Sequence, residues 1–187
     1  LRRWSWDTMG NALANKLTDR QCRTDRWAIE SGLELTESVG QVINVASGVI
    51  WGGPVSAELE SVITGTSGEC YLWYPSGGTY ASSGITKYDN TQYATAAGLQ
   101  TLSNNKYAVN WIWREAVESV RTPSGQVLHV VLGSDDYSLD DAVYSNLPIL
   151  RPPFLDRICI LVGRIIVKKG VTTAYSVESA ITTQFVG

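Results

Sequence analysis

The sequence predicts a mainly β fold, an antiparallel β-sandwich of the jelly-roll type, with a short N-terminal helical segment and one short helix near residues 138–145. Three observations predict it. Hydrophobic residues make up 44% of the chain and charged residues 18%, a balance that builds a core. Apolar and polar residues alternate from Ser31 onward, which is the period of a half-buried strand. Turn signals recur about every ten residues, as in sandwiches and barrels.

The first 30 residues differ from the rest of the chain in charge and in period. Asp7 can cap a short helix that ends at about Leu17, where apolar positions follow helical spacing. Residues 1–26 carry six Arg and Lys against three Asp, a net charge of +3, so the remaining residues sum to −6. We therefore predict a docking segment, residues 1–30, and a β-sandwich domain, residues 31–187, which the stretch 75–98 could divide into two.

The docking segment carries large apolar side chains, and aromatic anchors of this kind dominate protein interfaces. The predicted interface residues are Trp4, Trp6, Met9, Leu13, Leu17 and Trp27.

The first strands of the domain are short. Residues 33–38 and 41–46 predict two strands joined by a turn at Val39-Gly40, and residues 49–51 predict a third. In the next strand, residues 57–63, the side chains of Ala57, Leu59, Ser61 and Ile63 are expected to share one face. The turn at 65–68 is expected to close a hairpin between this strand and residues 69–74.

Residues 75–97 are rich in Ser, Gly, Thr, Tyr and Asn, and they predict a long loop or an irregular edge that exposes its tyrosines. Exposed aromatic rings can stack on sugars or contact a partner. The candidate contact residues are Tyr74, Tyr80, Tyr88 and Tyr93.

The second half of the chain predicts more regular elements. Residues 106–114 and 127–133 alternate around a turn at 122–125 and predict a hairpin, with Trp111 and Trp113 in the core. Ser138 precedes acidic residues and predicts the start of a short helix. Prolines 148, 152 and 153 predict an extended crossing. Residues 158–168 predict a central strand covered on both faces, and residues 172–185 a final strand.

No catalytic residues are predicted. The only histidine, His129, lies in a predicted strand without a nucleophile motif nearby, so a structural or interface role is favoured over that of a general base. Asp135, Asp136, Asp140 and Asp141 form the densest carboxylate cluster. A glycosidase pair and a calcium site both stay open there, but the start of a helix is favoured. We expect no metal site and no cofactor.

Partners of two kinds are not expected. An acidic domain does not favour nucleic acid, which requires clustered Lys and Arg. The longest apolar run, 158–167, is too short to cross a bilayer, and the first residues do not resemble a signal peptide. Cys22, Cys70 and Cys159 are isolated, as in chains made in a reducing cytosol.

Several blocks of the domain resemble a domain found in tail-fibre and related structural proteins of tailed bacteriophages. The likeness covers residues 33–185 and is strongest after Lys87. The blocks that carry it are residues 87–93, 98–107, 111–114, 129–133, 160–167 and 177–185.

The resemblance implies a non-enzymatic virion protein that assembles as a homotrimer in the cytoplasm of the host bacterium and contacts other virion proteins. We expect a tail fibre or fibre adaptor that docks through its N-terminal segment. Two alternatives are a capsid decoration or head-fibre protein and a module that binds host cell-surface glycans.

Overall fold

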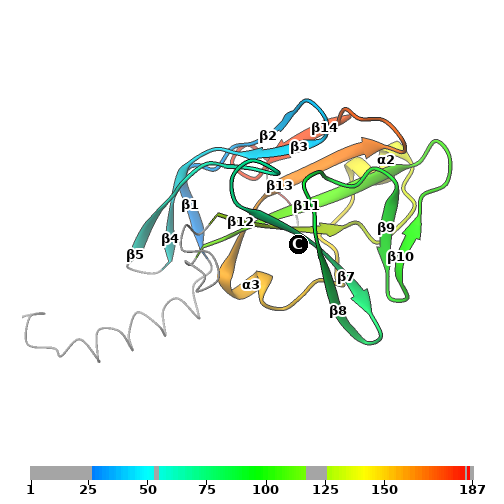
Figure 1. Cartoon of the computed structure of the whole chain (residues 1–187), viewed down its shortest axis with the longest axis horizontal. Coiled ribbons are helices and arrows are strands. Elements are labelled where there is room, and N and C mark those ends of the chain that lie inside the picture. Colours follow the sequence, from blue (N-terminus) through cyan, green and yellow to red (C-terminus); the bar gives the residue numbers. More distant parts are fainter. Residues whose placement is uncertain (1–26, 53–54, 117–125, 184, 186–187) are drawn as a thin grey trace, which may run out of the picture.

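The computed structural model describes residues 27–52, 55–116, 126–183 and 185. Within these ranges the chain is mainly β, as predicted, with two short helices (Figure 1). The strands are β1 (Ala28–Gly32), β2 (Leu35–Ser38), β3 (Val42–Val45), β4 (Gly48–Gly52), β5 (Val55–Leu59), β6 (Val62–Ile63), β7 (Glu69–Ser76), β8 (Thr79–Gly84), β9 (Gln92–Thr95), β10 (Gly98–Thr101), β11 (Tyr107–Glu115), β12 (Val127–Leu132), β13 (Cys159–Lys168) and β14 (Ser176–Ser179); the helices are α2 (Leu139–Val143) and α3 (Leu155–Ile158).

The centre of the molecule is a six-stranded sheet in the order β14-β13-β11-β12-β7-β8. Neighbouring strands are antiparallel except β12 and β7, which run parallel and depart from the all-antiparallel prediction. The two long strands β11 and β13 are buried along almost their whole length. Since successive side chains of a strand point to opposite faces, this sheet must be covered on both sides.

Two apolar clusters provide that cover. On one face Ile112 of β11 and Val130 of β12 pack against residues of β2, β3, β4 and β6, in a sandwich-like arrangement. On the other face Trp111 and Trp113 pack with residues of α2 and α3, as well as Phe185 near the C-terminus. The prediction that the two tryptophans are core residues is confirmed, because Trp111 is fully buried and Trp113 is 3% exposed.

The strands β1 to β6 form a three-stranded meander with a crease across it. Three chain segments run through both small sheets: β1 continues into β2, β3 into β4 and β5 into β6, each with one bend. The sheets β1-β4-β5 and β2-β3-β6 are therefore two halves of one meander. At the first bend Gly32 has φ +68° and a Cβ there would meet the Ser47 carbonyl oxygen at 2.1 Å, so only glycine fits. The crease wraps the meander over the central sheet, as Figure 1 shows for β2 and β3 beside β14 and β13.

A bulge in β13 fits this packing. Ile112 pairs with Gly163 but Trp113 pairs with Leu161, so Val162 is the extra residue, and both Ile160 and Val162 join the core under the meander. Gly163 has φ +153°, and a Cβ there would meet the Glu178 carbonyl oxygen at 2.2 Å and Leu35 Cδ2 at 2.8 Å. The glycine lets β14 and β2 approach the bulge closely.

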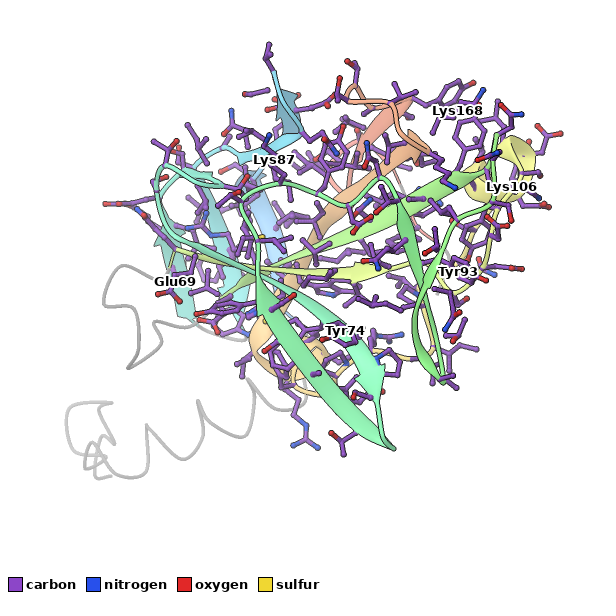
Figure 2. All side chains as sticks on the ribbon, turned by 45° about the vertical axis from the view of Figure 1, so that its right-hand side comes forward. Glu69, Tyr74, Lys87, Tyr93, Lys106 and Lys168 are labelled. Atoms are coloured by element: carbon purple, nitrogen blue, oxygen red, sulfur yellow. The ribbon has the colours of Figure 1, made fainter. Side chains whose placement is uncertain are left out.

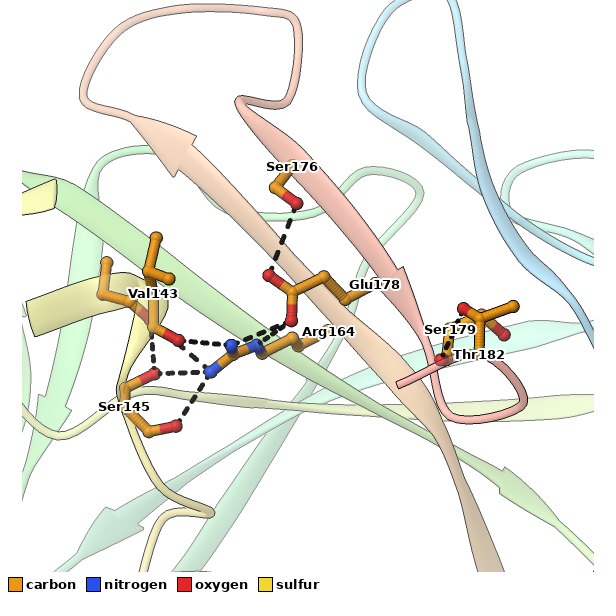
Figure 3. Close-up of polar contacts among 8 residues, drawn as sticks. Val143, Ser145, Arg164, Ser176, Glu178, Ser179 and Thr182 are labelled. Atoms are coloured by element: carbon orange, nitrogen blue, oxygen red, sulfur yellow. Dashed lines mark hydrogen bonds and ion pairs between the residues drawn. The ribbon is translucent and has the colours of Figure 1, made fainter. Parts of the chain in front are cut away.

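A buried arginine fastens α2 to the sheet (Figure 3). Arg164 of β13 is 5% exposed, and its Nη2 lies 2.8 Å from the Glu178 carboxylate. Its Nη1 and Nη2 donate to the Ser145 and Val143 carbonyl oxygens at 2.8 Å and 2.5 Å. The guanidinium carbon also lies 5.1 Å from the Trp111 ring centroid. One side chain thus satisfies carbonyl groups at the end of a helix that lack partners within it.

Several predictions for the second half are confirmed. β11 and β12 pair antiparallel, and β13 is an inner strand buried on both faces. Ser138 caps α2 by accepting a hydrogen bond from the Asp141 amide. The final strand is shorter than predicted, since β14 covers only residues 176–179. Helix α3, a single turn that follows the prolines, was not predicted.

Of the two alternatives predicted for residues 75–97, the long loop is wrong, whereas the edge fits β8, the outermost strand of the central sheet. β7 continues to Ser76, β8 pairs with it along residues 79–84, and β9 and β10 form a further hairpin. The small and polar side chains of β8 reflect its place at the edge of the sheet, with one neighbour and mostly exposed residues.

The single strand predicted for residues 57–63 is also wrong. The crease at Glu60-Ser61 divides it into β5, which pairs with β4, and β6, which pairs with β3. The alternation shifts by one position there, so that Val62 is buried and Ser61 exposed. The turn at 65–68 makes one bridge from Ile63 to Ser67 and no hairpin with β7, which pairs with β12 and β8 instead.

Candidate interaction site

Of the six predicted docking residues, the structure describes one. Trp4, Trp6, Met9, Leu13 and Leu17, together with the predicted helix, lie outside the described residues. Trp27 is half-buried, and its ring lies against Gly52, where a Cβ would meet ring atoms at 2.4 Å. β1 starts at the next residue and pairs with β4, so residues 28–30 belong to the meander although they fall within the predicted docking segment.

Trp27 forms one wall of a pocket of about 530 Å³. The pocket lies between the start of β1, the α3 region and the C-terminal stretch. Side chains of β11 and β13, including Trp113 and Leu161, also line it. The lining residues are Trp27, Ile29, Glu30, Trp113, Leu147, Arg151, Leu155, Asp156, Cys159, Ile160, Leu161, Ala180, Ile181, Thr183 and Phe185.

The charged residues of the pocket are Glu30, Asp156 and Arg151. The carboxylate of Asp156 accepts from Arg151 at 3.1 Å, and both side chains are partly exposed. Glu30 accepts a hydrogen bond from the Trp51 indole. With two carboxylates and one guanidinium, the charged side chains that line the pocket have a net negative charge.

A third carboxylate lies next to a lining residue of the pocket. Glu115 is 9% exposed and is paired in register with Cys159, a pocket residue. Burial raises the pKa of the Cys159 thiol, and the charges of Glu115 and Asp156 raise it further, so the thiol stays protonated and unreactive. Glu115 Oε2 is buried without a hydrogen-bond partner among the described residues.

His129 is held on both sides in the core. Its Nδ1 accepts from the Trp73 indole at 3.0 Å, which leaves the hydrogen on Nε2 facing Glu115 Oε1 at 3.3 Å. The Phe154 ring packs edge-on at 5.2 Å between centroids. Because both ring nitrogens are engaged and the residue is 3% exposed, the structure supports the prediction of a structural histidine.

The four candidate tyrosines do not form one platform. Tyr88 is 2% exposed, so the prediction that it contacts a ligand is wrong: its hydroxyl donates to Glu37 Oε1, and Glu37 Oε2 accepts from the Ala174 amide at 2.9 Å. Tyr74 is paired with Ala81 and Tyr80 with Pro75. Residues directly opposite share a face, so Tyr74 and Tyr80 point to opposite faces of the β7–β8 hairpin. Tyr93 lies on the separate β9–β10 hairpin (Figure 2).

Replacing Tyr88 with phenylalanine is expected to lower the free energy of unfolding by about 1.5 kcal/mol at pH 7, the usual worth of a hydrogen bond to a charged group. Burial, and then the bond to Glu37 and its charge, raise the pKa of Tyr88. The unfolded chain ionises near pH 10 whereas the folded one does not, so the wild type loses stability above that pH. The difference between wild type and variant should therefore shrink by roughly 1 kcal/mol between pH 9 and pH 11.

Urea denaturation at both pH values measures this difference. Tyr144→Phe is the matched control, because Tyr144 is 82% exposed and should change nothing at either pH. A difference that is the same at pH 9 and pH 11 would contradict the assignment.

The aspartate cluster is used for local structure. Asp141 accepts from the Ser138 hydroxyl at the start of α2, and Asp136 accepts from the Ser103 amide at 3.0 Å. Asp135 accepts from the Asp136 amide. These contacts support the helix-start interpretation. Over the described ranges, no group of three or more His, Cys, Asp or Glu side chains is arranged to hold a metal ion.

Comparisons with known proteins add no family to these observations. None of the helices in the described residues is both long and apolar enough to span a bilayer. Searches against family models, curated proteins and solved structures found no match.

Proposed function

We propose that this chain is a structural, non-enzymatic protein of a tailed-bacteriophage virion, of the tail-fibre or fibre-adaptor type. In this proposal it assembles as a homotrimer and docks on other virion proteins through its N-terminal segment. The observation that carries the proposal is the pocket beside Trp27, where that segment joins the body and where aromatic and aliphatic side chains lie next to charged ones. A recess lined by both apolar and charged side chains, next to a segment that carries tryptophans, has the composition of a protein interface.

The buried polar groups support a structural role. Arg164 connects β13, β14 and α2, and Glu37 connects β2 to Tyr88 and Ala174. His129 bridges Trp73 and Glu115. Each group joins different strands or helices of the body, which supports a structural use of these buried polar side chains.

A glycan-binding module is less well supported. Stacking on a sugar requires exposed rings on one surface, and Tyr88 is buried while Tyr74 and Tyr80 face opposite ways. A head-fibre or decoration protein would use the same docking surface at another place on the particle.

The test deletes residues 1–26 and keeps Trp27, because Trp27 packs on the body. In the phage that encodes the chain, we expect the truncated protein to fold but to be missing from purified particles, as measured by quantitative mass spectrometry. Ser5→Ala together with Asn11→Ala is the control and should be incorporated normally. Full incorporation of the truncated chain would refute docking through this segment.

Two further measurements test the rest of the proposal. Analytical sedimentation of the full chain should give the mass of a trimer, and a stable monomer would refute the proposed homotrimer. Immunogold labelling of particles should mark the tail, whereas labelling of the head would favour the decoration alternative.

A further inference from the structure

The pocket beside Trp27 has the properties of a site for an aromatic side chain. Its apolar lining includes Trp113, Leu147, Leu155, Leu161 and Phe185. Its volume of about 530 Å³ lies within the roughly 300–1,000 Å³ typical of sites that enclose a small ligand. A large ring is the side chain that gains most from burial in such a recess.

The charges around the pocket favour a basic occupant. Glu30 and Asp156 line it against the single positive charge of Arg151, and the Glu115 carboxylate lies behind Cys159 with one oxygen unpartnered among the described residues. A recess that combines apolar side chains with an excess of carboxylates favours an aromatic residue that has arginine or lysine beside it.

The chain itself contains such a sequence. Residues 2–6 read Arg-Arg-Trp-Ser-Trp, within a 26-residue segment of net charge +3 that enters the described structure at Trp27, on the wall of the pocket. Twenty residues, 7–26, separate Trp6 from Trp27. A stretch of this length can reach up to roughly 70 Å, far more than a return to the pocket needs. Covalent attachment also gives the segment an effective concentration on the order of millimolar.

We infer that the pocket binds the stretch Arg2–Trp6 of the same chain, with the indole of Trp4 or Trp6 inside and the arginines beside Glu30 and Asp156. This binding concerns the unassembled protein and does not depend on the proposed function. Its consequence is that the tryptophans of the segment are covered until a partner competes for them.

Photo-cross-linking in the full chain tests the inference. Benzoylphenylalanine placed at position 4 or 6 should, on irradiation, link to peptides covering residues 147–161 or 180–185 of the same chain, as mapped by mass spectrometry. The same group at position 18, outside the basic aromatic stretch, is the control and should not label these peptides.

Variants of the pocket sharpen the test. Thr183→Phe adds a ring at the pocket wall and should lower the cross-link yield about tenfold, which corresponds to about 1.4 kcal/mol. Thr172→Phe is the matched control at an exposed position away from the pocket and should leave the yield unchanged. Glu30→Gln keeps an acceptor for Trp51 but removes the charge, so the yield should fall and become less sensitive to salt.

Three outcomes would overturn the inference. They are cross-links that avoid the pocket peptides, cross-links only between two copies of the chain, and a yield that Thr183→Phe does not change.

Discussion

Replacing Arg164 with alanine is expected to lower the free energy of unfolding by about 3–5 kcal/mol, the range for removing one partner of a buried ion pair. The Glu178 carboxylate would lose the partner that its 2.8 Å contact provides. The carbonyl oxygens of Val143 and Ser145 would lose their donors at the same time. The Trp111 and Phe185 rings, which flank the guanidinium at 5.1 and 5.3 Å, would border a cavity.

Chemical denaturation measures the loss, and two further variants define its origin. Arg151→Ala is the matched control: its pair with Asp156 is partly exposed, and such a pair contributes at most about 1 kcal/mol. Arg164→Lys keeps the charge but cannot bond the carboxylate and two carbonyls in one plane, so it should recover less than half of the loss. If Arg164→Ala costs no more than Arg151→Ala, the network does not hold α2 to the sheet.

The parts of the fold that could be predicted are those where local alternation decides the structure. In β11 and β13 every position is a core position on one face or the other, so a long apolar run with a period of two leaves few alternatives. The cap of α2 was equally visible, because Ser138 and Asp141 interact within one turn.

The parts that could not be predicted depend on distant contacts. Tyr88 lies in a polar stretch that favours a loop, yet it is buried because Glu37, 51 residues earlier, accepts its hydroxyl. The crease at Glu60-Ser61 has no breaker in the sequence and follows from the meander bending over the central sheet. A local pattern cannot report either contact.

The same limit applies to the candidate site. The pocket combines residues near 27–30, 113, 147–161 and 180–185, and of these only Trp27 had been predicted to take part in binding. No local pattern marks the pocket, because its residues come from separate stretches of the chain. The arginine side chains in apolar strands are a signal of another kind: Arg114 and Arg164 both interrupt buried runs, and neither lines the pocket. A buried charge at such a position is either held in a hydrogen-bond network or left unpaired at a cost in stability, and only the structure distinguishes the two cases.

Arg114 is a buried charge of the second kind. It is fully buried in β11, and no acceptor among the described residues bonds its Nε, Nη1 or Nη2. Burial lowers the pKa of Arg114 to about 10, and the charge of Glu60 offsets only part of that effect. Glu60 is exposed and accepts from Gln126 at 2.8 Å instead.

Arg114→Met is therefore expected to raise the free energy of unfolding by up to about 3 kcal/mol at pH 8, because it removes a buried charge that has no acceptor among the described residues, less the cost of the space that the shorter side chain leaves. Because burial lowers the pKa of Arg114 in the folded chain below that in the unfolded chain, the penalty in the wild type is complete at neutral pH and declines only at strongly alkaline pH. The gain from methionine should accordingly be smaller at pH 11 than at pH 8. Arg157→Met, at an exposed position of α3, should change stability by less than about 0.5 kcal/mol at both pH values. Urea denaturation of the three proteins decides the matter, since a destabilised Arg114→Met would mean that the guanidinium has a partner that the core provides.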